Sequence, residues 1–360
     1  MPENAPRRRT AGLAAPLSLA AGLALLPVAP AAAAAAPAAA AAPSASLLST
    51  TGQAGQEAAA EYWTPERMAA ARPADVAPAA TADLLPQAPA GGSAQAAPRP
   101  LADATPALTA GEAVPRRGRP VAQAAATPVT RATAWTAGGA VTQRVGRLYF
   151  TRAGEDFVCS GTSVRAANES VVMTAGHCVT SGGRPSENVV FVPGLRGGAE
   201  PFGRWPARST FTTASWASRE QSTPPGLNFD VGFAVVGTRA GRTLAATVGA
   251  HPVGFDAPLD GVTVFGYPAA SSTSDGRTLQ FCRGLRFADL RGSTDGATNC
   301  TLGGGASGGP WLSGFDPATG EGTVTSVTSF AYEDDATVLY GPRLGAEART
   351  AFDEAAAARP

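Results

Sequence analysis

The chain has 360 residues, and its 28 basic and 28 acidic side chains give a formal net charge of zero. A nucleic-acid partner is not expected, because it would need a basic stripe on the surface. Residues 1 to about 130 are mainly alanine and proline with few large apolar side chains, so this third cannot bury enough surface to offset its chain entropy. The composition therefore predicts a single folded domain, at 136–360.

The first 35 residues have the layout of a secretory signal peptide. Three arginines precede the apolar stretch LAAPLSLAAGLALLPV, and small residues with several A-x-A cleavage sites follow it. A membrane anchor is the competing interpretation, but Pro16, Gly22 and Pro27 interrupt the stretch, which is short for a span of about 20 residues. We therefore expect export, cleavage of 1–35, and an extracellular protein without a membrane partner.

Residues 36–135 are expected to be a largely disordered propeptide or linker with one short helix near 65–72. In EYWTPERMAAARP, Thr64 is a hydroxyl cap, Pro65 suits the first turn, and Glu66 lies at the positive end of the helix dipole. A helix this short cannot fold alone. Either it docks on the domain as part of a propeptide, or it is incidental to a linker. The basic stretch PRRGRP at 115–120 is a candidate processing site.

From about Val141 the pattern changes to short apolar stretches separated by Gly, Pro, Asn and Ser. Eight of them have the length and the β-branched or aromatic enrichment of strands: RVGRLYF, SVVMTA, NVVFVPG, DVGFAVV, VTVFGY, RTLQF, GPWLSG and GTVTSVTSF. Many short strands with turns between them predict an all-β antiparallel barrel or sandwich. Near the end, GAEARTAFDEAAAA predicts a single helix after a glycine.

Four cysteines fall in two close pairs, Cys159 with Cys178 and Cys282 with Cys300. Disulfides agree with export. Sequential pairing would form two bridges, each of which stabilises the fold by about 3 kcal/mol in the chain-entropy model. Other pairings remain possible. A zinc site is not expected, because no pair has C-x-x-C spacing and the chain has two histidines.

The stretch TLGGGASGGPWL, 301–312, surrounds Ser307 with glycines. Glycine permits positive φ and close backbone approach, which suits a catalytic loop and an ordinary turn equally well. A phosphate-binding loop would need a lysine and a hydroxyl residue after the last glycine, where Pro310 and Trp311 stand instead. A nucleophilic serine needs a base, and the base needs a third group to orient it.

Two histidines are available as that base. His177 ends an apolar strand in VVMTAGHCV, whereas His251 precedes a proline in a turn-like stretch and is expected at the surface. For the third group, Asp230 heads the apolar strand of GLNFDVGFAVV, where an unpaired charge is costly. A surface aspartate at a strand edge is the simpler reading of Asp230, and Asp256 and Asp260 compete with it from a loop-like stretch.

The three motifs TAGHC, the aspartate heading an apolar strand, and GASGGP, in the order His, Asp, Ser, resemble the chymotrypsin-fold serine peptidases. With the export signal, the chain looks like the secreted bacterial branch that includes relatives of the glutamyl endopeptidases. The resemblance covers about residues 140–355. It implies an all-β fold of two six-stranded antiparallel β-barrels with a C-terminal helix. It also implies a serine endopeptidase, without a cofactor or metal, that is made as a precursor and cleaves protein or peptide substrates through an acyl-enzyme.

The resemblance assigns roles to individual residues. Ser307 would attack the scissile carbonyl, His177 would take and return the proton, and Asp230 would fix the imidazole tautomer. The amides of Gly305 and Ser307 would form the oxyanion hole. We further expect the protein to be a monomer, with its own propeptide as a docking partner.

Two departures from the family pattern bear on activation. Ala306 stands where the pancreatic-type enzymes have an aspartate that pairs with a newly freed N-terminus, and no Ile-Val-Gly-Gly start occurs near 135–145. Activation by that ion pair is therefore not expected. The Cys282 and Cys300 pair also differs from the usual second bridge of the animal enzymes.

The specificity pocket is expected to involve Thr301 near its base and Ser326, Val327 and Thr328 in its wall. None of these residues could pair with Arg or Lys, and the wall lacks the histidine that glutamyl endopeptidases use. A small or medium uncharged side chain is the predicted preference. Two other readings stay open: a catalytically silent protease-fold binding protein, and a surface or matrix protein whose Ala/Pro segment is the functional part.

Overall fold

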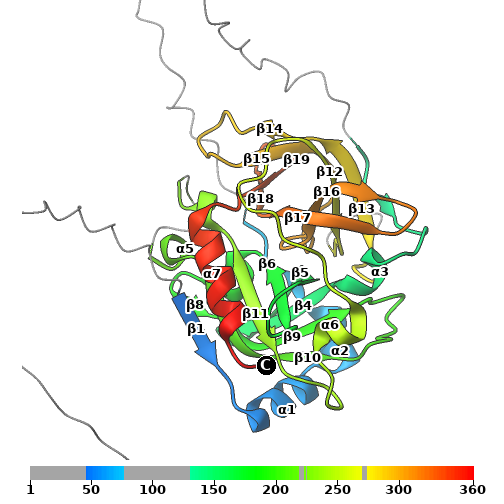
Figure 1. The fold of residues 1–360 in the computed structure, drawn as a ribbon, viewed down its shortest axis with the longest axis vertical. Coiled ribbons are helices and arrows are strands. Elements are labelled where there is room, and N and C mark those ends of the chain that lie inside the picture. The colour runs from blue at the N-terminus through cyan, green and yellow to red at the C-terminus, as the bar shows by residue number, and fades with distance from the viewer. Residues whose placement is uncertain (1–45, 77–129, 219–222, 224, 270–273) are drawn as a thin grey trace, which may run out of the picture. The chain divides into compact units, whose positions relative to one another are not determined.

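The computed structural model describes residues 46–76, 130–218, 223, 225–269 and 274–360 (Figure 1). The expected signal peptide at 1–35 and the basic stretch at 115–120 lie outside these ranges. Within them, no helix combines the length and the apolar character that crossing a membrane would require.

Six antiparallel strands form a closed barrel in the first half of the domain. They are β4 (Val145–Arg152), β5 (Glu155–Val164), β6 (Val171–Thr174), β9 (Glu187–Pro193), β10 (Trp205–Thr212) and β11 (Gly232–Val236). The strand order is β10-β11-β6-β5-β4-β9, and pairing of Trp205 with Phe191 closes the ring between β10 and β9. Closure leaves no long free edge. The barrel is filled by fully buried side chains such as Leu148, Val172 and Phe233.

The second lobe consists of two antiparallel sheets. One has the order β17 (Glu321–Val327), β16 (Pro310–Asp316), β12 (Gly261–Gly266), β13 (Gln280–Leu285) and β3 (Thr133–Ala134). The other has the order β14 (Phe287–Ala288), β15 (Gly296–Asn299), β19 (Asp335–Gly341) and β18 (Phe330–Tyr332). The disulfide between Cys282 and Cys300 joins the two sheets. Trp135, just after β3, packs edge-on against Phe265, Phe281 and Phe315.

The helices that follow residue 130 are short except for the last. They are α3 (Val141–Arg144), α4 (Gly176–Val179), α5 (Ala214–Ser218), α6 (Leu244–Val248) and α7 (Ala346–Ala357), with a 3₁₀ helix η2 (Leu227–Phe229) and a small hairpin of β7 (Thr180–Ser181) and β8 (Arg184–Pro185). The predicted all-β architecture with a C-terminal helix is confirmed. Helix α7, red in Figure 1, lies along the first barrel with Ala348, Ala351 and Ala355 buried. Asn168 donates to the carbonyls of Ala355 and Ala358, which caps its C-terminal end.

Residues 46–76 pack on the first barrel. Strand β1 (Ser46–Thr50) pairs with β10, helices α1 (Gln53–Tyr62) and α2 (Pro65–Ala70) follow, and β2 (Arg72–Pro73) pairs in parallel with β5. Helix α2 begins as the sequence predicts, because Thr64 accepts a hydrogen bond from the Arg67 amide. Strand β1 and helix α1 were not predicted.

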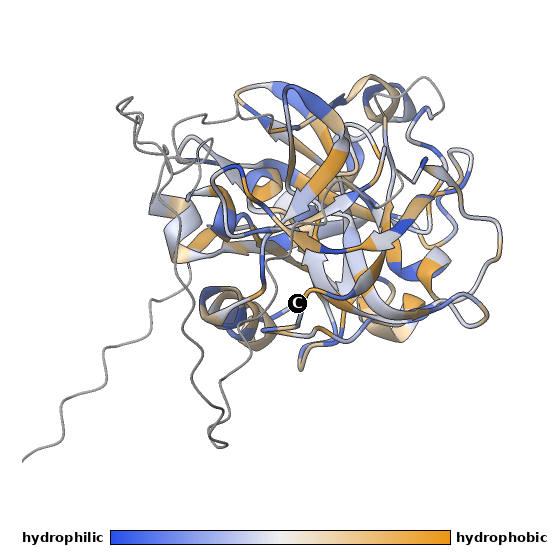
Figure 2. Cartoon of the chain, turned by 90° about the horizontal axis from the view of Figure 1, so that it is seen from above, coloured by the Kyte–Doolittle hydropathy of each residue, from blue (hydrophilic) through white to orange (hydrophobic). Residues whose placement is uncertain are grey.

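Hydropathy follows this arrangement. Figure 2 shows orange, apolar stretches along the interior strands and blue, hydrophilic stretches on outlying turns and helix faces. The main core runs through the first barrel and includes Trp63 and Met68 of the N-terminal segment together with Leu312 and Val327 of the second lobe. The core therefore continues from one lobe to the other, and the motif residues His177, Asp230 and Ser307 lie where the lobes meet.

Candidate active site

His177 lies in α4, directly after strand β6, and only 2% of it is exposed. The residue before His177, Gly176, must be small. A Cβ at Gly176 would lie 2.7 Å from the Trp216 ring and 2.9 Å from Asp230 Oδ1. The TAGHC turn can therefore bring its backbone against Asp230, and the His177 amide donates to Asp230 Oδ1 over 2.7 Å.

Asp230 follows the 3₁₀ helix η2 and is completely buried. Its Oδ2 lies 2.8 Å from His177 Nδ1 and also accepts a hydrogen bond from Ser329 Oγ. Both carboxylate oxygens therefore have donors, which is the condition for burying a charged group. Because a carboxylate accepts hydrogen bonds, this contact assigns a proton to His177 Nδ1, and the tautomer with its proton there presents a lone pair at Nε2.

Ser329 was missed by sequence reasoning. It is the penultimate residue of the stretch GTVTSVTSF, in which the hydroxyl residues Ser326 and Thr328, with Val327, are predicted to form a pocket wall. Nothing in its type or spacing separates it from them, and its role depends on a contact with Asp230, 99 residues away in the sequence.

The turn that carries Ser307 is held by strand β5 of the first barrel. Ser160 donates its amide hydrogen to Ser307 O over 2.7 Å and its hydroxyl to Gly305 O over 2.9 Å. Gly305 and Gly308 have φ of +90° and +79°, a region that L side chains rarely adopt. A Cβ at Gly308 would lie 2.0 Å from Thr174 Oγ1, so this glycine is needed for space as well.

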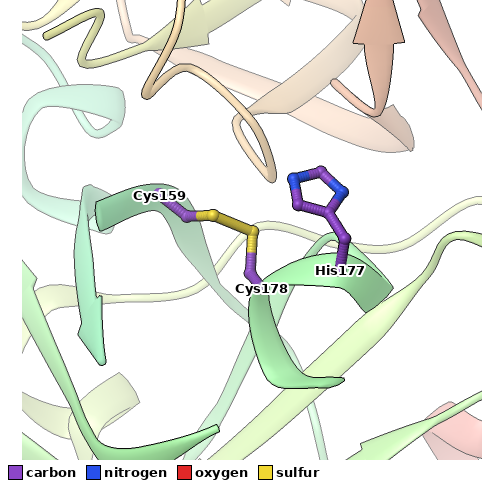
Figure 3. Close-up of side chains that lie close together, drawn as sticks. All are labelled: Cys159, His177 and Cys178. Atoms are coloured by element: carbon purple, nitrogen blue, oxygen red, sulfur yellow. A yellow bond between two sulfur atoms is a disulfide. The ribbon is translucent and has the colours of Figure 1, made fainter. Parts of the chain in front are cut away.

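A disulfide joins Cys159 of β5 to Cys178, next to His177, and Figure 3 shows the imidazole ring beside it. A second disulfide joins Cys282 to Cys300, so the four cysteines pair in sequential order. Ligand atoms of Cys159, His177 and Cys178 lie within 4.8 Å of one another, a grouping that could suggest a metal site. The two sulfurs are bonded to each other, so they are not thiolate ligands. The bridge instead ties the His177 turn to the strand that holds Ser307.

The structure brings a residue of the N-terminal segment to the same place. Asp75 Oδ1 accepts a hydrogen bond from the Gly305 amide over 3.1 Å and lies 3.5 Å from Ser307 Oγ. Partial burial raises the pKa of Asp75, while the Gly305 amide, His177 and the Ser307 hydroxyl each lower it. Groups from two of the three motifs, TAGHC and GASGGP, therefore act on one carboxylate. Among the described residues, His177 Nε2 has no hydrogen-bond partner, although it is buried.

A cavity of about 230 Å³ opens beside Ser307. Of the four residues predicted for the pocket, Thr328 lines it, whereas Thr301, Ser326 and Val327 do not. Thr301 Oγ1 instead accepts from the Ala132 amide, and Ser326 Oγ donates to Pro342 O. The walls come from two stretches, Leu302–Gly304 and Ser329–Glu333, with Asp75, Val76, Ala336 and Leu339.

The prediction that His251 lies at the surface is wrong. It is fully buried next to Arg144, and burial followed by the Arg144 charge lowers its pKa to about 4. It contacts none of the motif residues. Its backbone joins Ser163 and Arg165 of the segment that ends β5, so its role is in the fold.

No protein-family model and no curated protein matches the chain. Solved structures do match. The protease Anisep from Arthrobacter nicotinovorans is 36% identical with a TM-score of 0.56, and the match covers 60% of this chain and 96% of Anisep. The thermostable serine protease AL20 from an extremophilic microorganism is 34% identical with a TM-score of 0.56, covering 60% and 98%. A Glu endopeptidase, 19% identical with a TM-score of 0.50, covers 63% of this chain and 97% of its own, and shares the fold.

Proposed function

The chain belongs to the chymotrypsin-fold serine proteases of bacteria, and on that premise we propose that it is a secreted serine endopeptidase made as a precursor with an N-terminal propeptide. It would hydrolyse peptide bonds through an acyl-enzyme. The observation that carries this proposal is the fully buried hydrogen-bonded pair of His177 and Asp230, 2.8 Å apart, at the junction where the turn of Ser307 is also fixed.

In the proposed reaction, Ser307 Oγ attacks the carbonyl carbon of the scissile bond while its proton passes to His177 Nε2. The tetrahedral intermediate collapses when that proton moves to the leaving nitrogen, which breaks the C–N bond and leaves an ester on Ser307. Water then attacks the ester, with His177 again taking a proton and returning it to Ser307 Oγ. Asp230 keeps Nδ1 protonated and stabilises the imidazolium that forms twice in each cycle.

The backbone amides of Gly305 and Ser307 would stabilise the oxyanion. The contact that the Gly305 amide makes with an Asp75 carboxylate oxygen supports this role, because it shows the amide available to a negatively charged oxygen beside Ser307. Removing one such donor from an active site of this type typically costs about 2.7 to 4 kcal/mol in the barrier.

The cavity beside Ser307 supports a preference for small or medium uncharged side chains. Leu302, Phe330, Ala331 and Leu339 give it apolar walls, and its single glutamate, Glu333, is solvent-exposed. About 230 Å³ suits a side chain of modest size. Export is supported by the two disulfides, which persist in oxidising compartments, and by the signal-like residues 1–35.

Labelling by a fluorophosphonate probe tests the proposal, because the probe reacts with activated serines. The protein should label after its N-terminal segment has been removed, and both Ser307→Ala and His177→Ala should abolish labelling. Cleavage of a peptide library would then identify the preferred side chain. A wild-type protein that never labels, before or after removal of the segment, would instead be the catalytically silent binding protein.

A further inference from the structure

The segment after α2 crosses the region where the lobes meet. Arg72 and Pro73 pair in parallel with Phe157 and Val158 of β5, and the Ala74 amide donates to Val158 O over 3.2 Å. Two residues on, Val76 forms a parallel bridge with Phe330 of the second lobe. Asp75 lies between these two attachments, so its position is fixed by pairing on both sides.

The side chain of Asp75 occupies the position where substrate chemistry would take place. Its Oδ1 accepts from the Gly305 amide and faces Ser307 Oγ, and its Oδ2 lies 2.0 Å from the place where a Cβ on Gly304 would stand. A peptide carbonyl at this place would be attacked. A carboxylate is a poor electrophile and has no leaving amine, so Asp75 fills the oxyanion position without being consumed.

Val76 extends the contact into the cavity. It packs on the cluster of Phe330, Tyr332 and Tyr340 and forms part of the cavity wall. Asp75 as a whole remains solvent-exposed, so the active site is obstructed but not sealed from water. An exposed side chain is not held in place by burial, so the obstruction depends on the contacts that other residues of the segment make with the domain.

Trp63 is the strongest of those attachments. Its side chain is fully buried, its Nε1 donates to Asn188 O over 2.7 Å, and its ring contacts Tyr149 of β4. Arg204 donates to the backbone carbonyls of Trp63 and Ala60. Buried aromatic residues surrounded by polar contacts are the usual source of affinity at protein interfaces.

Weaker contacts lie between this anchor and the active site. Tyr62 donates to Asp156 over 2.7 Å, Arg67 pairs with the same carboxylate at 3.1 Å, and Arg72 pairs with Glu155 at 2.6 Å. Such exposed pairs set orientation more than affinity. Strand β1 adds main-chain pairing with β10 at the other end of the segment.

From these contacts we propose that residues 46–76 are an inhibitor of the chain's own active site, with Trp63 as the anchor and Asp75 as the blocking group. The inference rests on the proposed function and adds to it a binding surface and its partner.

The arrangement also predicts how the inhibition is released. The chain re-enters the second lobe at Thr130, where the backbone pairs with Cys300 and β3 pairs with β13. A cut between residues 76 and 130 therefore leaves both sides attached, so the segment inhibits until it dissociates or is degraded.

The experiment uses the full chain with a recognition site for an unrelated protease inserted between residues 76 and 130. Labelling by the fluorophosphonate probe is followed on the intact chain, on the cut chain, and on the cut chain after dilution. The intact wild type should label slowly, and Asp75→Ala should label faster by about tenfold, the effect of losing one hydrogen bond to a charged group. Asp75→Asn should fall between them, because its amide oxygen can still accept from Gly305.

Arg349→Ala is the control, since it removes the exposed ion pair between helix α7 and Asp256, outside residues 46–76 and outside the active site; its labelling rate should equal that of the wild type. After the cut, residues 46–76 should co-elute with the domain, and activity should appear only on dilution. Trp63→Phe keeps an aromatic ring but loses the bond to Asn188, so the cut form should become active at higher protein concentration.

The outcomes separate the two proposals. If the intact wild type and Asp75→Ala label equally fast, the segment is no inhibitor although the protein is an active serine protease. If residues 46–76 dissociate from the domain immediately after the cut, Trp63 does not anchor the segment. If no form labels, including Asp75→Ala and the diluted cut chain, the proposed function fails and the inhibition fails with it.

Discussion

Ser329 Oγ and His177 Nδ1 share one acceptor, the Oδ2 atom of the buried Asp230. Ser329 comes from the second lobe and His177 from the first. Asp230, whose carboxylate orients the imidazole in the proposed mechanism, is therefore held by hydrogen bonds from both lobes. Four testable predictions follow from this and related geometry.

Ser329→Ala removes a donor to Oδ2 of the buried carboxylate. The Asp230 side chain then loses one of its restraints and holds His177 less firmly, so we expect kcat to fall by about tenfold, the effect of one hydrogen bond to a charged group. Peptide hydrolysis by the matured protein measures this. Ser313→Ala, which removes a hydroxyl bonded to Asp260 and Thr325 far along β16, is the control. Equal losses in the two variants would contradict the role of Ser329.

Asp230→Asn keeps the shape of the side chain but places an NH₂ group or a neutral oxygen against His177 Nδ1. The imidazole is then driven toward the tautomer with its proton on Nε2, which cannot accept the proton of Ser307. We expect kcat to fall by about 10⁴-fold with the fold retained. Kinetics together with a thermal unfolding curve test this. A loss of only a few fold would exclude Asp230 as the orienting residue.

Gly308→Ala should disrupt the turn of Ser307. The new Cβ would meet Thr174 Oγ1 at 2.0 Å and Ser160 O at 2.4 Å, at a φ of +79°. We expect loss of labelling by the fluorophosphonate probe and a loss of stability of about 2 kcal/mol or more. Gly314→Ala is the matched control, because its φ is +60° but nothing lies within 4 Å of the added Cβ. That variant should label normally and lose about 1 kcal/mol.

His251 should make the stability pH-dependent. Its folded pKa is lowered to about 4 by burial and by Arg144, with Glu321 acting in the opposite direction. Between about pH 6.5 and 4 the unfolded chain binds this proton and the folded chain does not, so stability falls as pH falls through that window. Urea unfolding at several pH values measures the slope. His251→Gln should flatten it, and an unchanged slope would show that other groups cause it.

Much of the candidate site could be predicted from the sequence, because local motifs mark it. TAGHC needs a glycine before His177 for packing against Trp216, and GASGGP needs positive φ at two glycines. These requirements appear within a few residues of the functional side chain. The roles assigned to Ser307, His177 and Asp230 remain predictions until labelling is measured.

The rest depends on contacts between distant parts of the chain. Ser329 and Asp75 act through partners 99 and 230 residues away, so no local pattern marks them. Strands β5 and β10 escaped prediction because EDFVCSGTSV and WPARSTFT are rich in polar residues. Their hydroxyls satisfy backbone groups inside the fold, as Thr212 does by donating to Val231 O. A polar residue in a buried strand is not recognised until its partner is known.

Ser160 lies on a strand of the first barrel, yet three of its hydrogen-bond partners, Gly305, Ser307 and Tyr267, belong to the second lobe. A hinge motion that opened the two lobes would break these bonds and displace the Ser307 turn with them. The proposed reaction therefore requires the two lobes to stay closed on each other around Ser307.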